Sequence, residues 1–568
     1  MNDRVAEYLM PVGISDFRML QTISPKGKRY LSIDKSEFIG EIMEDGSQVI
    51  LITRPRRFGK TLALSMLRYF LADKVGGKET AELFTNLTIA KDTKVMAYQG
   101  KYPVIFISFK EIKDNNFKAA KTRIADDIRL LYEEFSYLAP SLSKSEAKIY
   151  QSILDRESND EDLQRSLANL SMYLTRFHGV EPYLLIDEYD TPIQTAYKND
   201  YYQDMTSFVL AMFGSCLKDN IYITKAILTG ITRVAKESLF SGVNNFELYT
   251  LFDDKYRQYF GFTEDEVNDL FARSGIKLKS EEIKDWYNGY QCGGLLIYNP
   301  WSIIKCLNKK GTIASHWVNS SDNKLATDLI LREGYEIKEK FQLLLEQGEI
   351  TEIIDDNLVY GSLKENRASV WSLLLMSGYL KATKIVTDSF GSKICTLSLP
   401  NKEVLYFYCQ AIQEWLANDK GISWYRNCLQ DLLDAKLESF EENLQTILLE
   451  TFAFADVNRK NQENFYHGFV LGLIVSLRET HEIKSNRESG LGFYDVLIIP
   501  KNKLQRAIIL EFKAVENKKD LEKTAQKALE QIQNRKYHIE LKQRDITNIV
   551  SIGIAFSSKH LKMYHNIN

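Results

Sequence analysis

The sequence predicts an α/β protein with a parallel sheet near its N-terminus, a mostly helical middle region and a smaller α/β unit at its C-terminus. Two patterns indicate this class. Up to about residue 230, near-continuous apolar runs alternate with helical, charged sequence, and strand and helix patterns begin again after about residue 450. A chain of 568 residues is also long enough for roughly three to four domains, each with its own core.

Four apolar runs are the expected strands of the N-terminal sheet. Because these runs do not alternate with polar residues, we expect them to be buried on both faces, as strands of a parallel sheet covered by helices are. The runs span residues 48–53, 103–109, 182–187 and 222–230.

The remaining chain divides into two further parts. Residues 263–440 are mostly helical in pattern and carry little readable chemistry, which is typical of a connector or regulatory region. The C-terminal part predicts helices over residues 463–478 and 519–537, and strands over residues 494–499, 507–512 and 549–557. We expect domain limits at residues 1–262, 263–450 and 451–568.

Composition excludes several classes of protein. Lys and Arg number 73 against 76 Asp and Glu, so a global basic field is absent and any nucleic-acid binding must come from local patches. The six cysteines are scattered without a zinc-site or disulfide pattern, which indicates a reducing compartment. Residues 1–15 do not resemble a signal peptide and the apolar stretches are too short to span a bilayer, so we expect a cytoplasmic protein without a membrane partner.

The segment RPRRFGKT, residues 54–61, follows the first apolar run and precedes a helical pattern. It ends in the Gly-Lys-Thr of a phosphate-binding loop, where Gly59 and the helix N-terminus would cradle phosphate, Lys60 would reach the β and γ phosphates, and Thr61 would ligate magnesium. The first glycine of the usual pattern is replaced by Arg54. The other two arginines of the segment, Arg56 and Arg57, are either further phosphate contacts or exposed charges.

Polar residues at the ends of two later strands fit the same site. Asp187 suits the magnesium shell, and Glu188 suits the polarisation of an attacking water. Thr229 and Arg233 follow another apolar strand, at a position where a hydroxyl or guanidinium could sense the γ-phosphate. The alternatives are a solvated acidic loop for the first pair and a surface ion pair for the arginine. The combination predicts a site for ATP and magnesium.

The C-terminal part contains the residue types of a magnesium nuclease. Asp495 lies in one predicted strand, and Glu511 and Lys513 end the next. Two carboxylates would bind magnesium, the metal would lower the pKa of a bound water, and the lysine would position that water for in-line attack. A loop over residues 500–506 sets Asp495 opposite Glu511, whereas a tighter turn sets it opposite Ile508, so the site requires the longer loop. The alternative is an edge strand that ends in exposed charge.

Several segments together resemble a bacterial AAA-ATPase-like family that carries a C-terminal PD-(D/E)xK nuclease domain. They are PVGISDF (11–17), IDKS (33–36), RPRRFGKTL (54–62), LLIDEYDTPI (184–193), TGITRVAKESLFSGVNN (229–245), WYNGYQCG (286–293), YNPWSI (298–303), SNRESGLGFYD (485–495), EFK (511–513) and ALEQI (528–532). The resemblance covers most of the chain, and the family shares the arginine in place of the first loop glycine. It implies a P-loop ATPase-like domain followed by a restriction-endonuclease-like domain.

The resemblance also implies two further residues of the nuclease site. Glu463 would be an additional acidic metal ligand, and Gln531 would face the site from a helix. A helix N-terminal acid favoured by the helix dipole is the other reading of Glu463. The lysines of residues 518–536 are either phosphate contacts or a solvated helix face, because acidic residues are mixed among them.

These observations predict an ATP-binding, ATP-regulated and magnesium-dependent nuclease with ATPase and phosphodiesterase sites, acting on nucleic acid, and on DNA in particular. One alternative is a nucleotide-switched regulatory protein whose C-terminal domain binds nucleic acid or a partner without cutting. Another is an ATPase motor with a structural C-terminal domain, against which the set Asp495, Glu511 and Lys513 argues. The sequence leaves open whether the protein is a homo-oligomer.

Overall fold

A computed structural model gives the fold of the chain. It describes residues 8–233, 246–317, 340–341, 343–345, 348–355, 358, 360–364, 367–451, 466, 470, 473–489, 492–534 and 538–567. Contacts between Cα atoms divide the chain into two compact units. The first consists of residues 1–325 and 351–404, and the second of residues 326–350 and 405–568.

The first unit is built on a five-stranded parallel sheet. In spatial order its strands are β6 (Val104–Ser108), β7 (Tyr183–Asp187), β8 (Lys225–Gly230), β3 (Val49–Thr53) and β9 (Phe246–Tyr249). Each residue of β3, β7 and β8 is buried, because helices cover both faces of these strands. The sheet therefore places the carboxyl ends of β3, β6, β7 and β8 at one edge.

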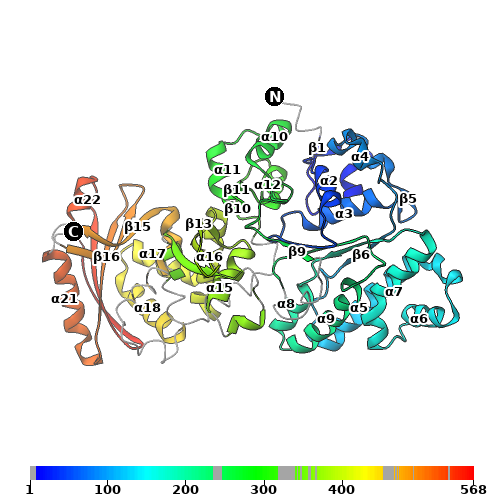
Figure 1. Ribbon diagram of the computed structural model, residues 1–568. Coiled ribbons are helices and arrows are strands. Elements are labelled where there is room, and N and C mark those ends of the chain that lie inside the picture. The colour runs from blue at the N-terminus through cyan, green and yellow to red at the C-terminus, as the bar shows by residue number, and fades with distance from the viewer. Residues whose placement is uncertain are drawn as a thin grey trace. The chain divides into compact units, whose positions relative to one another are not determined.

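Two layers of helices cover this sheet (Figure 1). On one side lie α2 (Glu37–Glu44), α3 (Lys60–Leu71) and α4 (Thr93–Met96). On the other lie α5 (Phe117–Glu134), α6 (Lys144–Leu154), α7 (Asp160–His178), α8 (Thr191–Lys198) and α9 (Tyr202–Leu217). Helix α7 shows the local signals: Asn159 caps its N-terminus, its first turn carries three acidic residues, and Gly179 ends it with a φ of 70°.

Short elements complete the N-terminal part. They are β1 (Tyr8–Leu9), α1 (Phe17–Gln21), β2 (Arg29–Tyr30), β4 (Lys74–Val75), β5 (Lys78–Glu79), η2 (Ala81–Phe84), η3 (Thr88–Lys91) and η4 (Ser136–Ser141). Helix α1 is held against α3 because the backbone N–H of Phe17 donates to Ser65 at 2.9 Å and Tyr69 donates to Asp16 at 2.8 Å.

The middle of the chain contributes mostly helices, together with short strands. The helices are α10 (Glu264–Ser274), α11 (Ser280–Tyr287), α12 (Pro300–Asn308), η6 (Tyr360–Lys364), α15 (Arg367–Met376), α16 (Lys402–Ala417), η7 (Asn418–Lys420), α17 (Ile422–Leu433) and α18 (Leu437–Thr451). The strands are β10 (Tyr290–Cys292) paired with β11 (Leu295–Ile297), and a sheet of β12 (Ile350–Ile354), β14 (Lys393–Ser398) and β13 (Lys381–Thr387).

The second unit contains a mixed sheet whose strands follow chain order: β15 (His481–Ser489), β16 (Gly492–Pro500), β17 (Ala507–Ala514), β18 (Ile549–Ser557) and β19 (His560–Ile567). The strands pair antiparallel except β17 with β18, which are parallel. Helix α21 (Leu521–Asn534) makes the crossover between the parallel strands, and η8 (Val475–Glu479), η9 (Lys518–Asp520) and α22 (Ile539–Gln543) complete the unit.

The predicted fold class is confirmed. The four predicted N-terminal strands are present, with ends that shift by at most three residues, and the last predicted strand has the bounds of β18. Strands β9, β15 and β19 and the middle strands were not predicted; β13, for example, alternates weakly and is largely exposed, so it lacks an apolar strand signal. The predicted helix over residues 463–478 lies largely outside the described residues.

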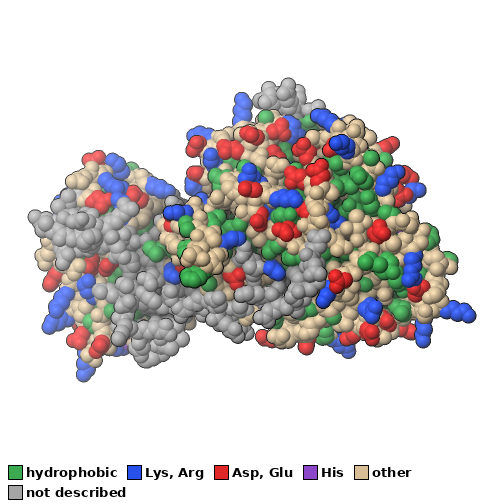
Figure 2. Space-filling model, in the orientation of Figure 1, with side chains coloured by type: hydrophobic (Ala, Val, Ile, Leu, Met, Phe, Trp, Pro, Cys, Tyr) green, Lys and Arg blue, Asp and Glu red, His purple; other side chains and the backbone are tan. Residues whose placement is uncertain are grey.

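The distribution of surface charge and the state of the cysteines agree with the amino-acid composition. Acidic and basic side chains are interspersed over the face that Figure 2 shows, and the net charge is -3. All six cysteines are free thiols. Within the described ranges, helices that combine the length and the apolar character needed to cross a membrane are absent.

A buried carboxylate joins three segments of the middle region. Glu403, fully buried at the start of α16, accepts hydrogen bonds from the Ser302 hydroxyl at 2.7 Å and from the backbone N–H groups of Trp317, at 2.6 Å, and His316. Burial raises the pKa of Glu403 to about 7, although the hydrogen bonds act in the opposite direction.

This raised pKa predicts a loss of stability with increasing pH. The folded state keeps the Glu403 proton between about pH 4.5 and 7 while the unfolded state has released it, so the contribution is present below pH 4.5 and is lost as the pH rises through 7. Replacing Glu403→Gln should remove a component on the order of 1 to 3 kcal/mol from the pH dependence of the unfolding free energy. Urea unfolding of both proteins from pH 5 to 8 tests this, and parallel pH profiles would contradict it.

Candidate nucleotide and nuclease sites

The phosphate loop connects the central strand β3 to helix α3. Gly59 stands at the N-cap of α3 with a φ of 88°, a left-handed conformation that glycine adopts without strain. Arg57 also has a positive φ, 68°. The loop therefore turns sharply and presents the first backbone N–H groups of α3 at the carboxyl edge of the sheet.

Arg54, which stands where the usual pattern has glycine, is fully buried. Its guanidinium donates to the carbonyl oxygens of Thr53 and Thr250, at 2.8 and 2.7 Å, and lies 5.4 Å from the centre of the Phe260 ring. Its backbone N–H donates to Gly230 of the neighbouring strand at 3.1 Å. The side chain thus holds the start of the loop against the sheet and points away from the phosphate side.

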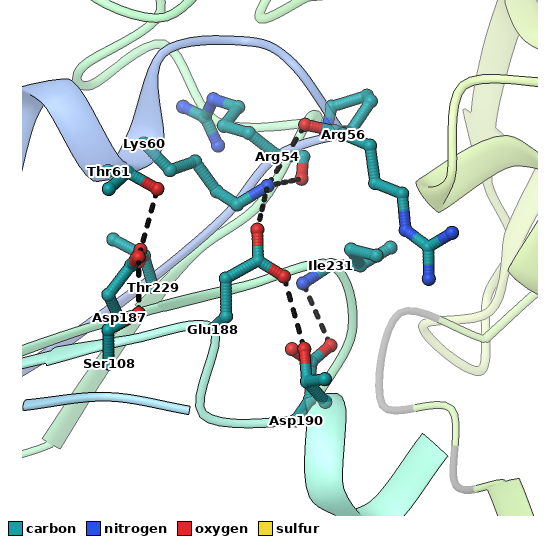
Figure 3. A network of polar contacts seen from close by, with 12 residues as sticks. Arg54, Arg56, Lys60, Thr61, Ser108, Asp187, Glu188, Asp190, Thr229 and Ile231 are labelled. Atoms are coloured by element: carbon teal, nitrogen blue, oxygen red, sulfur yellow. Dashed lines mark hydrogen bonds and ion pairs between the residues drawn. The ribbon is translucent and has the colours of Figure 1, made fainter. Parts of the chain in front are cut away.

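Lys60 lies inside the loop, 3% exposed. Its Nζ donates to the carbonyl oxygens of Arg54 and Pro55, at 3.0 Å each, and lies 3.9 Å from Glu188 Oε1. Figure 3 shows the ammonium group between the loop and the acidic end of β7. Lys60 and Glu188, the acid expected to polarise water, therefore lie side by side.

Asp187 is the centre of the site (Figure 3). It is fully buried and accepts three hydrogen bonds from hydroxyl groups. Thr61 and Ser108 donate to Oδ2 at 2.9 and 3.0 Å, and Thr229 donates to Oδ1 at 2.9 Å. These donors come from α3, β6 and β8, so one carboxylate joins the ends of three neighbouring elements to β7.

Glu188 and Asp190 continue the acidic segment. Glu188 has a φ of 52° and accepts a hydrogen bond from Thr191 at 3.1 Å. Asp190, fully buried, accepts from the backbone N–H groups of Ile231 and Thr232 at 2.8 and 3.0 Å. Asp190 therefore fixes the loop that follows β8 to the loop that follows β7.

The two adjacent acids at the end of β7 have opposite pKa shifts. Burial and the neighbouring charge of Glu188 raise the pKa of Asp187. Burial also acts to raise the pKa of Glu188, but Lys60, Arg56 and the hydrogen bond from Thr191 outweigh it and lower the pKa. The arrangement keeps Glu188 ionised beside the lysine, as a base requires.

A cavity of about 1110 Å³ opens over the phosphate loop. Its walls include Gly59, Lys60, Thr61 and Glu188, together with apolar side chains from residues 8–38 and from the start of α12. This volume is slightly above the range of roughly 300 to 1,000 Å³ that is typical of ligand sites. The site is therefore large enough for a nucleotide.

The three predicted arginines lie in different surroundings. Arg57 lines the cavity and stacks on Trp301, with its guanidinium 4.4 Å from the ring centre. Arg56 also lines the cavity and donates to Gln194 at 2.7 Å. The Arg233 guanidinium lies 5.6 Å from the Phe246 ring centre and is not among the residues that line the cavity, so its expected contact with the γ-phosphate stays a prediction.

The nuclease residues meet on β16 and β17. The register pairs Val496 with Leu510 and Ile498 with Ile508, and one further step brings Asp495 opposite Glu511. The backbone N–H of Phe512 donates to Asp495 Oδ2 at 2.6 Å. The longer loop that the site requires is present, between Pro500 and Ala507.

Glu511 is almost completely buried, 1% exposed. Its Oε1 accepts from Lys513 at 3.3 Å and from the amide of Gln531, whereas its buried Oε2 lacks a hydrogen-bond partner among the described residues. Burial and the charge of Asp495 raise the pKa of Glu511 to about 7. The predicted cluster of Asp495, Glu511, Lys513 and Gln531 is therefore found.

Both acidic sites suit a hard divalent cation, which prefers oxygen ligands. At the phosphate loop, Thr61 and Asp187 offer a hydroxyl and a carboxylate 2.9 Å apart. At the nuclease site, a cation would satisfy the unpaired Oε2 of Glu511 and neutralise the two opposed carboxylates. Groups of three or more metal-ligating side chains are absent from the described residues, and the predicted third acid, Glu463, lies outside them.

A glycine controls the distance between α21 and the nuclease strands. Gly553 of β18 pairs with Glu511, and a Cβ at this position would overlap the Ala525 carbonyl oxygen and the Leu529 nitrogen. The helix backbone therefore rests directly on β18. This close approach is what lets Gln531 reach Glu511.

Sequence reasoning missed four residues that shape these sites. Ser108 and Asp190 bind or flank the β7 acids, and Arg54 was read only as a missing glycine. Ser108 had a usable signal, because it lies one residue before the end of the apolar run 103–109, one strand away from Asp187, and parallel strands end at a common edge. Gly553 had none, since a glycine in an apolar strand does not reveal which helix lies above it.

The sheet order, the loop and the acidic strand end define a P-loop type of nucleotide-binding domain. Residues 11–240 match the family model described as a predicted AAA-ATPase, AAA-ATPase-like, and residues 461–566 match that of the PD-(D/E)XK nuclease superfamily. The chain thus combines an AAA-ATPase-like domain with a PD-(D/E)XK nuclease superfamily domain, as the resemblance predicted.

The chain is also similar to individual proteins. An uncharacterized protein in the vnfD 5′ region of Azotobacter chroococcum mcd 1 is 25% identical over 557 residues, which are 96% of each chain. The Walker-type ATPase PABY2304 of Pyrococcus abyssi aligns over 68% of this chain and 99% of its own, with 14% identity and a TM-score of 0.35.

The contact at Gly553 predicts the effect of a single methyl group. Gly553→Ala should push α21 from the sheet, destabilise the second unit by about 1 to 3 kcal/mol and separate Gln531 from Glu511. Denaturant unfolding compared with Ser551→Ala, on the same face of β18, checks the stability. Equal stability of the two variants would contradict the prediction.

Proposed function

We propose that the protein is an ATP-regulated, magnesium-dependent nuclease. The observation that carries the proposal is the pair of opposed carboxylates Asp495 and Glu511. A buried oxygen of Glu511 lacks a hydrogen-bond partner among the described residues, and Lys513 lies beside it. A phosphate loop with its acidic partner residues, in the other unit of the same chain, supports the regulatory part.

In the nucleotide site, the loop N–H groups and Lys60 bind the phosphates, and Thr61 and Asp187 hold magnesium. Ser108 and Thr229 keep the Asp187 carboxylate in place. Glu188, which is ionised and directed toward the loop, acts as the base that polarises the attacking water.

In the nuclease site, Asp495 and Glu511 hold magnesium, which supplies Lewis acidity and a more acidic water when bound. Gln531 fixes the Glu511 carboxylate through its amide, and the strand pairing fixes Asp495 against it. Lys513 is 33% exposed, so its ammonium reaches both Glu511 and solvent, where it orients the attacking water toward a phosphodiester.

We further propose DNA as the nucleic acid and the cytoplasm as the compartment. The free thiols support a reducing environment. Because the chain is close to neutral overall, we expect recognition of the phosphate backbone by local groups such as Lys513 rather than by a general basic field.

Removal of the loop lysine tests the nucleotide site. Lys60→Ala deletes a buried charge, and the loss of one charged hydrogen bond, about 1.5 to 3 kcal/mol, should weaken ATP binding roughly 10- to 150-fold. Titration calorimetry with Mg-ATP measures the change. Lys91→Ala, at an exposed lysine at the end of η3, is the matched control and should bind as wild type does. Unchanged binding by Lys60→Ala would reject the assignment.

Neutralising the buried acid tests the nuclease site. Glu511→Gln should lower the cleavage rate roughly 100-fold or more, because a charge that holds the cation is worth about 3 kcal/mol in the transition state. Wild type and variant are compared on double-stranded DNA, single-stranded DNA and RNA, with and without ATP and magnesium. Glu516→Gln, exposed and on the same segment, controls for the substitution itself.

The same assay distinguishes the alternative function. Cleavage that needs Glu511 supports the nuclease and identifies its substrate. Binding of nucleic acid without cleavage on every substrate, by a folded protein that binds ATP, would instead establish a nucleotide-switched binding protein.

A further inference from the structure

The motif WYNGYQCG, residues 286–293, lies outside both proposed sites. It begins at the end of α11 and continues through β10 (Tyr290–Cys292), and its residues are absent from the described wall of the nucleotide cavity. The segment nevertheless contacts the phosphate loop on one side and the start of α16 on the other. These two sets of contacts are what suggest a role for it.

The contact with the phosphate loop is aromatic. The Phe58 ring, fully buried within the loop, meets the Tyr290 ring edge to face, with 5.1 Å between the centres and 79° between the planes. Gly378 packs beside them, and a Cβ there would lie 3.0 Å from Pro55 and 3.4 Å from Tyr290. Pro55 and Phe58 of the loop therefore pack against the middle region of the chain.

The contact with α16 is made by the two residues before Tyr290. Gly289 has a φ of 97°, and a Cβ at this position would overlap the carbonyl oxygen of Pro400. The Asn401 side chain donates to the Asn288 carbonyl at 2.8 Å, while its oxygen accepts from Val404, in the first turn of α16, at 3.1 Å. The first turn of α16 is thus fixed to the motif.

The far end of the motif is also fixed. The Gly293 N–H donates to Leu251 at 2.9 Å, and Arg257 donates to the Gly293 carbonyl. The preceding residue, Thr250, is the one whose carbonyl accepts from Arg54. The motif is therefore fixed at both ends, and its far end is bound to residues 250–251, the segment that also holds Arg54 of the loop.

We propose that residues 288–292 couple the phosphate loop to helix α16, with Tyr290 as the positioning residue for the loop. The inference rests on the proposed binding of ATP. The chain passes from the first unit to the second within α16, after Val404, so this helix is the covalent route toward the nuclease residues.

The loop contains a contact that ATP would change. Lys60 donates to the Pro55 carbonyl, and a triphosphate competes for that ammonium group. When the bond is exchanged, Pro55 and Phe58 adjust together, and Tyr290 and Gly289 carry the adjustment to Pro400 and α16. The coupling needs only that ATP prefer one arrangement of this packed element over the other.

Hydrogen exchange of the full-length chain, with and without Mg-ATP, tests the coupling. In wild type, ATP should alter exchange in peptides covering residues 54–61 and in peptides covering residues 402–417. In Tyr290→Leu, which removes the ring but stays apolar, saturating ATP should still alter exchange at residues 54–61, and the response at residues 402–417 should be lost. Tyr290→Phe keeps the ring and should restore it.

A matched control separates coupling from loss of stability. Tyr132 is also buried, packs against the tilted ring of Tyr150 and donates to the Ser166 carbonyl, away from the loop. Tyr132→Leu should therefore destabilise the first unit and leave both ATP responses intact.

Each outcome of the experiment has one meaning. A wild-type response at residues 402–417 that persists in Tyr290→Leu overturns the coupling, and so does a wild-type response confined to residues 54–61. Absence of any response at residues 54–61 in wild type overturns the proposed ATP binding itself, and the coupling with it.

Discussion

The three hydroxyl hydrogen bonds to Asp187 are the interaction on which the nucleotide site depends. A buried carboxylate is stable only when its oxygens are satisfied, and here the donors come from the helix after the phosphate loop and from the strands on either side of β7. The sheet edge, the loop and Glu188 are therefore positioned by one group. A cation that binds Asp187 would exchange with hydroxyls already arranged around it, so the site is organised before its ligand arrives.

The phosphate loop forms its turn although Arg54 replaces the first glycine of the usual pattern. Arg54 is buried and held by backbone carbonyl groups, and the freedom that glycine gives is supplied by Gly59 and by the positive φ of Arg57. Burial of a guanidinium is costly unless its donors are used, so this residue ties the start of the loop to the segment after β9. The loop is consequently fixed at Arg54 and packed against Tyr290 at Phe58, and between them the Pro55 carbonyl accepts a hydrogen bond from Lys60.

Much of the fold could be predicted from the pattern of apolar and polar residues in the sequence. Continuous apolar runs located the N-terminal strands, and the register argument for Asp495 and Glu511 was correct because side chains on paired strands share a face. The half-exposed strands of the middle region were missed, since packing rather than composition decides them. The expected γ-phosphate contact of Arg233 rests only on its position after a strand, and its guanidinium lies over the Phe246 ring. The roles of the site residues, and the expected limits at residues 262 and 450, stay predictions.

The path of the chain between its two units has a consequence for how they can be divided. The chain changes unit three times, at residues 325, 350 and 404, so each unit is assembled from separate stretches of sequence. A single proteolytic cut at any one of these points would leave the units joined. A fragment that begins after residue 404 would lack residues 326–350 of its own unit. Neither unit is therefore one continuous segment of sequence, and a single recombination event at any of these points would leave at least one unit assembled from two parents.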